Sequence, residues 1–295
     1  MSSLRPKKRF GQHFLRDLRV VECIVAAFAP RPADHVVEIG PGEGVLTRAL
    51  VGRVARLDLV ELDRDLAAQL AQTYAGAPGV TVHQADALKF DFRALARPGE
   101  RLRLIGNLPY NISTPLLFHA LEQLDGVREA ATAPSMARGP RLDSGMESRA
   151  MQQGCGDYGL GPISDMLFML QKEVVDRMAA TPGGKDYGRL SVMLQWRARV
   201  EKLFDVPPGA FHPPPKVDSS VVRLTPHETP PVDVRDPQRF AAIVRAAFGQ
   251  RRKVLRNTLK GLVTPETMER LGIEPGRRAE TLSLGEFAAL ANTPG

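Results

Sequence analysis

The chain has 295 residues, of which 43% are hydrophobic and 25% are charged, and these values argue against a chain that is disordered throughout. The formal net charge of +7 favours a polyanionic partner without establishing one. Cys23 and Cys155 are far apart and lack CxxC spacing, so we expect neither a disulfide framework nor a zinc site. A secretion signal is not evident and the longest apolar run, 20–29, is too short for a bilayer, so we expect a soluble cytoplasmic protein.

Short β-branched runs alternate with helical stretches from residue 36 onward, a pattern typical of parallel strands joined through helices in an α/β domain. The first expected strands are Val36–Ile39, Leu57–Leu62, Val80–His83 and Leu102–Gly106. Ligands bind outside the carboxyl ends of the strands in open α/β sheets. The residues that follow each run are therefore the candidates for a functional site.

A glycine-rich turn with GxGxG spacing, Gly40 to Gly44, follows the first of these strands, and such a turn lets the backbone approach a ligand closely. Glu61 lies at the end of the second strand, where a carboxylate can accept hydrogen bonds from both hydroxyls of a ribose. A dinucleotide-binding dehydrogenase shares both features, although the third glycine of GxGxxG is missing here. The pair therefore predicts a nucleoside-containing ligand and leaves its identity open.

Two further motifs follow the third and fourth strands. Asp86 is placed to accept from an adenine amino group, and its simpler alternative is a helix N-cap. The Asn107-Leu108-Pro109-Tyr110 motif combines a proline-restrained backbone with an amide side chain and an aromatic ring. The exocyclic amine of adenine is a poor nucleophile, so acceptors aimed at its hydrogens would help it react, while Tyr110 offers a face for a flipped-out base.

The later elements include a stretch, 125–162, that is rich in glycine and lacks apolar periodicity, so we predict a flexible insertion there. Met166–Met178 has apolar residues at near-helical spacing and is predicted to be a buried helix. Val200–Val206 and Val217–Leu224 are predicted to complete the sheet. Four prolines mark 226–237 as a linker that leads into a helical segment.

A basic segment lies between residues 236 and 266, and the stretch 237–265 contains no acidic residue. Its cations are Arg239, Arg245, Arg251, Arg252, Lys253, Arg256 and Lys260. Apolar residues at helical spacing, among them Phe240, Ile243 and Val244, are expected to be buried, which leaves the cations free to contact phosphates. A solvated helix face is the alternative, although such faces usually mix both signs of charge.

The chain resembles the ribosomal RNA adenine dimethyltransferases, in particular their bacterial small-subunit branch, over nearly its whole length. The motifs that carry the resemblance are 8–15, the glycine turn, Glu61, Asp86, Asn107–Tyr110, 171–174, Tyr187–Val192 and Phe211–Ser219. The resemblance implies an S-adenosylmethionine-dependent enzyme that dimethylates N6 of two adjacent adenines near the 3′ end of 16S ribosomal RNA, within 30S particles.

The resemblance also implies roles for particular residues. A cofactor site would be built from His13, Leu15, Gly40, Glu61, Asp86, Ala87 and Asn107. His13 departs from the asparagine usual at that position, although an imidazole also donates and accepts hydrogen bonds. Phe211 would close over the target base opposite Tyr110. The residues expected to hold RNA come instead from the charge of the basic segment and are Arg251, Arg252, Lys253 and Arg256. A metal ion is not implied.

We therefore predict a Rossmann-like, seven-stranded class I methyltransferase domain over residues 1–226 and a small helical RNA-binding domain over 227–295, acting as a monomer. A large-subunit RNA adenine methyltransferase of the erythromycin-resistance type shares the Asn107–Tyr110 motif, but Tyr187–Val192 and Phe211–Ser219 favour the small-subunit enzyme. A ribosome-assembly factor whose binding matters more than its catalysis is the alternative from another class.

Overall fold

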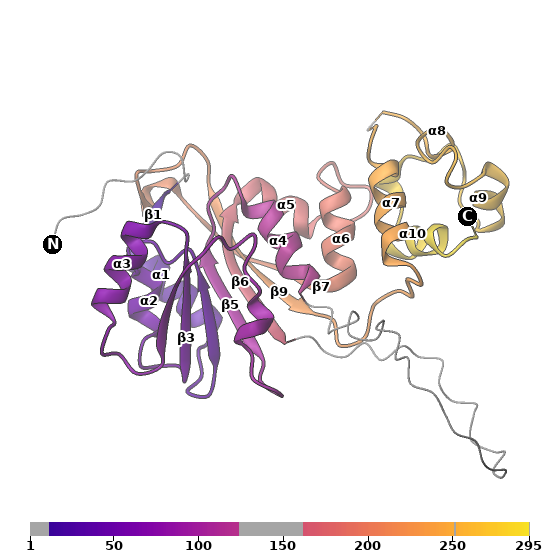
Figure 1. The fold of residues 1–295 in the computed structure, drawn as a ribbon. Helices are drawn as coiled ribbons and strands as arrows, with labels where there is room; N and C mark the ends of the chain where they lie inside the picture. The colour runs from indigo at the N-terminus through magenta and orange to yellow at the C-terminus, as the bar shows by residue number, and fades with distance from the viewer. Residues whose placement is uncertain (1–11, 124–161, 251, 295) are drawn as a thin grey trace, which may run out of the picture.

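The computed structural model describes residues 12–123, 162–250 and 252–294. Its main sheet has seven strands in the order β4-β3-β2-β5-β6-β9-β7, with helices on both faces (Figure 1). The strands are β2 (His35–Ile39), β3 (Arg56–Glu61), β4 (Val80–Gln84), β5 (Leu102–Asn107), β6 (Ile163–Gln171), β7 (Ala198–Val206) and β9 (Ser219–Pro226). This arrangement confirms the predicted seven-stranded α/β fold.

The order of the strands determines where the crevice at the edge of the sheet lies. Strands β2 to β6 run parallel to one another, and β9 is antiparallel to both β6 and β7. The chain moves from β2 outward through β3 to β4, then returns to pair β5 with the other side of β2. Such a reversal leaves a crevice at the carboxyl ends of the two central strands. In this sheet those ends are Ile39 and Asn107.

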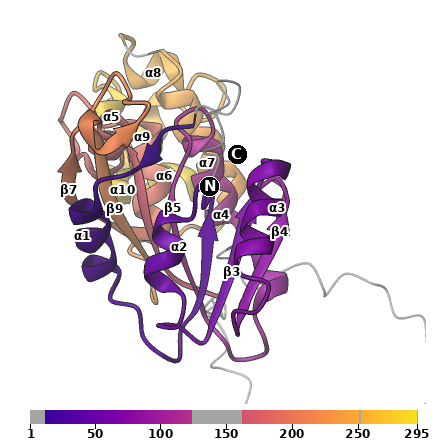
Figure 2. The ribbon, with the colours of Figure 1, turned by 90° about the vertical axis from the view of Figure 1, so that its left-hand side faces the viewer.

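Side chains alternate between the two faces of the sheet, as expected for strands buried on both sides. On one face Val36, Leu57 and Ile105 pack in a core with α1 (Leu18–Phe28) and α2 (Val45–Leu50). On the other, Val37 and Leu104 pack with α4 (Ser113–Glu122), α5 (Lys172–Ala179) and α6 (Arg189–Arg197). Figure 2 shows α1, α2 and α3 (Arg64–Thr73) on the near side of the molecule.

The predicted buried helix over Met166–Met178 was wrong in its first half. Residues up to Gln171 form β6, and the helix α5 begins only at Lys172. The run Met166–Leu170 is buried throughout because β6 lies inside the sheet with cores on both faces. A continuous apolar run does not distinguish a two-sided strand from a helix.

The C-terminal helices form a core of their own beyond α6. They are α7 (Pro237–Ala247), α8 (Leu255–Thr258), α9 (Pro265–Arg270) and α10 (Leu284–Ala291), at the opposite end of the molecule from α1–α3 (Figure 1). Phe240, Leu255 and Phe287 are fully buried there, together with Val192 of α6. The helical segment that the sequence predicts after residue 237 is confirmed. Of the predicted insertion 125–162, only Pro162 lies within the described residues.

Candidate active site

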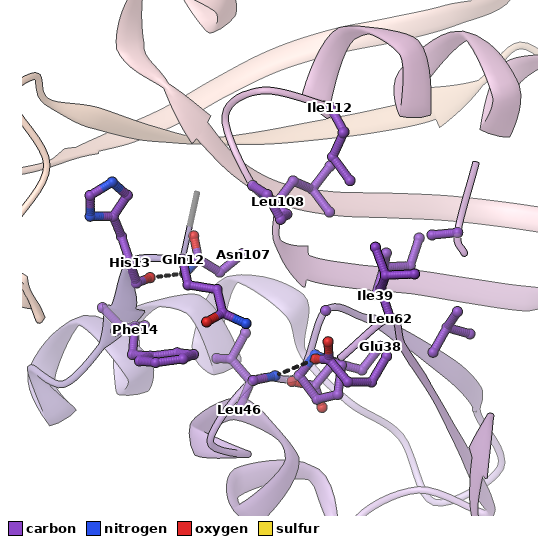
Figure 3. Close-up of a pocket in the computed structure, with 18 of the residues that line it drawn as sticks. Gln12, His13, Phe14, Glu38, Ile39, Leu46, Leu62, Asn107, Leu108 and Ile112 are labelled. Atoms are coloured by element: carbon purple, nitrogen blue, oxygen red, sulfur yellow. Dashed lines mark hydrogen bonds between the residues drawn. The ribbon is translucent and has the colours of Figure 1, made fainter. Parts of the chain in front are cut away.

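A pocket opens at the crevice between β2 and β5. Its lining comes from five separate segments, residues 12–15, 38–46 without Gly44, 60–62, 85–87 and 107–112. Figure 3 shows the N-terminal segment with His13 and Phe14 on one side of the pocket, and Glu38 and Ile39 of β2 on another. Four of the five segments follow or end a parallel strand, so the sheet topology brings them together.

The glycine turn after β2 has a backbone that side chains would disfavour. Gly40, Gly42 and Gly44 all have positive φ, at 66°, 58° and 74°. A Cβ on Gly42 would lie 3.0 Å from the ring of Phe14, which packs directly on the turn. Glycine is therefore required here both for conformation and for close contact with the N-terminal segment.

Glu61, at the end of β3, faces the glycine turn. Its Oε2 accepts from the backbone N–H of Gly42 at 3.1 Å, and its Oε1 accepts from that of Asp63 at 2.9 Å. Burial raises the pKa of Glu61, and these two hydrogen bonds partly offset the effect. Each carboxylate oxygen keeps further lone pairs, so the group remains an acceptor for hydroxyls in the pocket.

Glu38 also lines the pocket, and no role was predicted for it from the sequence. Its side chain is almost fully buried, and Oε2 accepts from the Thr47 hydroxyl at 2.7 Å. Burial raises the pKa of Glu38 to about 7. Glu38 lies two residues before the glycine turn, and a carboxylate near the end of a buried strand is the sequence signal that could have pointed to it.

Asp86 and Ala87 follow β4 at the pocket edge. Asp86 is half-buried, and its Oδ1 accepts from the backbone N–H of Leu88 at 3.0 Å. The carboxylate therefore caps a turn, and not the N-terminus of a helix as the simpler alternative had it, while it also lines the pocket beside Ala87. The two roles coexist because capping engages only one of the two oxygens.

The Asn107–Tyr110 motif closes the end of β5. The backbone N–H of Leu108 donates to the carbonyl of Met169 at 3.1 Å, which anchors the motif to β6. Asn107 Nδ2 donates to the backbone carbonyl of His13 at 2.9 Å. Because the amide nitrogen is engaged there, Asn107 Oδ1 is left as the acceptor of this side chain.

Tyr110 is held by residues that are distant in the sequence. Its hydroxyl lies 2.6 Å from Ser219 Oγ at the start of β9. The ring of His13 stacks on it, with the two ring centroids 5.5 Å apart and their planes inclined by 28°. Neither contact was predicted, since no local pattern links residues 13, 110 and 219.

Phe211 does not line the pocket. It belongs to the short strand β8 (Phe211–His212), which pairs with β1 (Phe14–Leu15) in a two-stranded sheet. Its side chain is 4% exposed and packs in the core with Leu15 and Val21. The β1–β8 pairing directs the Phe211 ring into the core, and its closure over a base opposite Tyr110 stays a prediction.

The basic segment is mostly available to solvent. Arg252, Lys253 and Arg256 are exposed, as are Arg245 and Lys260, whereas Arg251 lies outside the described residues. The expectation that every cation in the segment is free was wrong.

The exception is Arg239, whose guanidinium donates to backbone carbonyls of Ala291 at 3.0 Å and Leu262 at 3.2 Å. This half-buried side chain therefore links α7 to two other segments of the helical core.

The described ranges contain no group of three or more His, Cys, Asp or Glu side chains placed to hold a metal ion. Among the same residues, no helix combines the length and the apolar composition needed to cross a bilayer.

Comparison with known proteins identifies the family. Residues 3–293 match the ribosomal RNA adenine dimethylase family. The chain belongs to this family. It is 49% identical over 288 residues to ribosomal RNA small subunit methyltransferase A of Pseudomonas aeruginosa, covering 98% of this chain and 94% of that protein. It is 51% identical over 286 residues to the protein of the same name from Methylococcus capsulatus, covering 97% and 96%.

Solved structures support the fold of this dimethylase family member. A dimethyladenosine transferase from Plasmodium falciparum superimposes with a TM-score of 0.69 at 23% identity, covering 94% of this chain and 96% of that one. The 23S rRNA methyltransferase ErmE gives a TM-score of 0.64 at 24% identity, covering 94% and 98%. The predicted class I methyltransferase fold is thereby confirmed. The family is confirmed by the match over residues 3–293, and a methyl-donor cofactor follows from the family.

Proposed function

We propose that the chain uses S-adenosylmethionine to dimethylate N6 of two adjacent adenines near the 3′ end of 16S ribosomal RNA. The observation that carries the proposal is the orientation of Asn107, whose amide nitrogen is bound to the His13 carbonyl so that Oδ1 remains an acceptor at the crevice. Near 50% identity over the full length to proteins named ribosomal RNA small subunit methyltransferase A supports this substrate over large-subunit RNA.

The residues of the pocket fit the proposed cofactor. Glu61 is an acceptor suited to ribose hydroxyls. It lies beside the glycine turn, where residues other than glycine would place Cβ atoms in the space beside the pocket. Asp86 has one carboxylate oxygen left for an adenine amino group, and Ala87 and Leu15 add apolar surface. When bound, the cofactor supplies a methyl group already activated on a sulfonium.

The chain itself would mainly position the target amine. Asn107 Oδ1 accepts a hydrogen of the amine, which returns electron density from the adenine ring to the nitrogen. Tyr110 provides a face for the extruded base, a contact of about 1 to 3 kcal/mol. The mechanism calls for alignment and acceptors, with no strong base.

We further propose the division of labour predicted above, a catalytic domain over residues 1–226 and an RNA-binding domain over 227–295. Three exposed cations, Arg252, Lys253 and Arg256, support an RNA-contacting surface on the helical core. Arg251 remains a prediction for the same surface. We expect a monomer acting in the cytoplasm on 30S particles.

The decisive experiment incubates the protein with radiolabelled S-adenosylmethionine and separately with unmethylated 30S and 50S particles, then maps the modified nucleotides. We expect label in 30S particles alone, as N6,N6-dimethyladenine at two adjacent positions near the 3′ end of 16S RNA. Label in 23S RNA would instead support the large-subunit activity. Binding to 30S particles without any label would support an assembly factor.

A further inference from the structure

His13 makes three contacts at once, two with the Asn107–Tyr110 motif and one with Pro213. Its backbone carbonyl accepts from Asn107 Nδ2 at 2.9 Å, and its ring lies against that of Tyr110 (Figure 3 shows the first contact). Its Nδ1 lies 2.8 Å from the backbone carbonyl oxygen of Pro213. Because a carbonyl oxygen only accepts hydrogen bonds, Nδ1 carries the proton and donates it there. One residue thus joins the Asn107–Tyr110 motif to the segment after β8.

The Tyr110 ring is restrained at two points. Ser219 Oγ, in a fully buried side chain, lies 2.6 Å from its hydroxyl. That contact fixes the position of the hydroxyl, but it does not prevent the Tyr110 ring from rotating about the axis that runs through the hydroxyl. The imidazole of His13 opposes this rotation, because it covers one face at a centroid distance of 5.5 Å. The orientation of the Tyr110 plane therefore depends on His13.

The same distance decides which face of Tyr110 is open to a base. A base inserted between two rings needs them about 7 Å apart, the sum of two van der Waals contacts of about 3.5 Å. The 5.5 Å between the centroids of His13 and Tyr110 is too short for that. The target base is therefore expected on the other face of Tyr110, and His13 supports the ring from behind.

We propose that His13 is a positioning residue for methyl transfer: its backbone orients Asn107, and its ring, held by Pro213, fixes the plane of Tyr110. The inference rests on the proposed function and changes the role implied for His13 by resemblance, from a cofactor ligand to a support for the motif. The proposal also gives the imidazole of His13 a role, stacking on Tyr110, that requires an aromatic ring.

Side-chain variants separate the two contributions, since the backbone contact with Asn107 survives substitution. His13→Ala removes the ring, and His13→Phe keeps a ring but loses the donor to Pro213. We expect His13→Ala to lower the single-turnover methylation rate about 10- to 100-fold at saturating RNA and cofactor, the usual cost of a small misplacement. His13→Phe should recover the rate to within about threefold, because stacking is restored. His212→Ala, a matched change at an exposed histidine of β8, should leave the rate unchanged.

Cofactor affinity distinguishes positioning from cofactor binding. Calorimetry on the protein without RNA should give His13→Ala a cofactor Kd within about threefold of wild type. The reason is that the His13 ring stacks on Tyr110 and donates a hydrogen bond to Pro213, and the proposal gives it no contact with the cofactor. A loss expressed wholly as a weaker cofactor Kd, with a normal rate at saturation, would overturn the proposal. A normal rate and a normal Kd together would overturn it as well.

A third measurement does not depend on activity. In protein labelled with 3-fluorotyrosine, the Tyr110 fluorine signal is assigned by its loss in Tyr110→Phe. It should shift in His13→Ala, where the neighbouring ring current is gone, and stay in place in His212→Ala. An unchanged signal in His13→Ala would refute the stacking contact. If the wild-type protein failed to methylate 30S particles, the proposed function would fail, and this spectrum would still decide whether His13 fixes Tyr110.

Discussion

Glu38 offers the sharpest test of the electrostatics of the pocket. Its pKa is raised from 4.5 to about 7, chiefly because burial disfavours the charged carboxylate, while the Thr47 hydroxyl partly offsets that effect. A group whose pKa is higher in the folded state contributes stability that is complete below the unfolded value, here 4.5, and is lost as the pH rises through about 7. The folded protein therefore becomes less stable through Glu38 as the pH rises over this interval.

The size of the effect follows from the two pKa values. The interval from 4.5 to about 7 corresponds to roughly 3 kcal/mol, of which roughly 2 to 3 kcal/mol falls between pH 5 and pH 8. Glu38→Gln removes the titrating group and keeps an acceptor for the Thr47 hydroxyl. Relative to wild type, the variant should gain that amount in free energy of unfolding when the pH is raised from 5 to 8.

Urea denaturation of the cofactor-free protein, followed by far-UV circular dichroism at both pH values, measures this difference. Titrating groups that do not interact with Glu38 cancel in the comparison, so the difference reports Glu38 together with its charge repulsion with Glu61. Glu22→Gln makes the same chemical change on the exposed side of α1 and serves as the matched control. If the stability curves of wild type and Glu38→Gln run parallel from pH 5 to pH 8, the assignment of a raised pKa to Glu38 is wrong.

Three further variants test the proposed function. Asn107→Ala should lower kcat about 100-fold with cofactor Kd nearly unchanged, because it deletes the acceptor aimed at the amine; near-normal turnover would contradict that role. Glu61→Ala should weaken cofactor binding about 10- to 100-fold in calorimetry, through loss of a charged acceptor, whereas an unaltered Kd would remove Glu61 from the ribose site. Changing Arg252, Lys253 and Arg256 together to Gln should reduce the slope of log affinity for RNA against log salt by about 2 to 3. An unchanged slope would mean that these cations do not contact phosphate.

Much of the pocket could be predicted because its parts follow strands in the sequence. Gly40, Glu61, Asp86 and Asn107 each come directly after or at the end of a β-branched run, and parallel strands bring such ends to one edge. The runs before Gly40, Glu61 and Asn107 are mostly buried, whereas β4 before Asp86 lies at the sheet edge and is only partly buried. Their strand character is predicted because these short runs alternate with helical stretches. Local pattern and sheet topology here point to the same answer.

The wrong predictions share a different cause. Met166–Leu170 is apolar at every position, and whether such a run forms a strand or a helix depends on its neighbours in space. Arg239 looks like any other arginine of the basic segment, yet its guanidinium meets backbone carbonyls contributed by residues more than twenty positions away. Neither property is present in a window of sequence, because both arise only when distant segments pack.

The pairing of β1 with β8 shows the same principle at the pocket itself. Leu15 lies opposite Phe211 in this small sheet, and both side chains are buried in the core under α1. Residues just before Leu15 then reach the two halves of the pocket, Phe14 against the glycine turn and His13 against Tyr110. The buried pair Leu15–Phe211 therefore anchors the residues that touch both ends of the pocket. The burial of Phe211 thus has a consequence for the site even though its ring does not enter it, since loosening that pair would release Phe14 and His13 together.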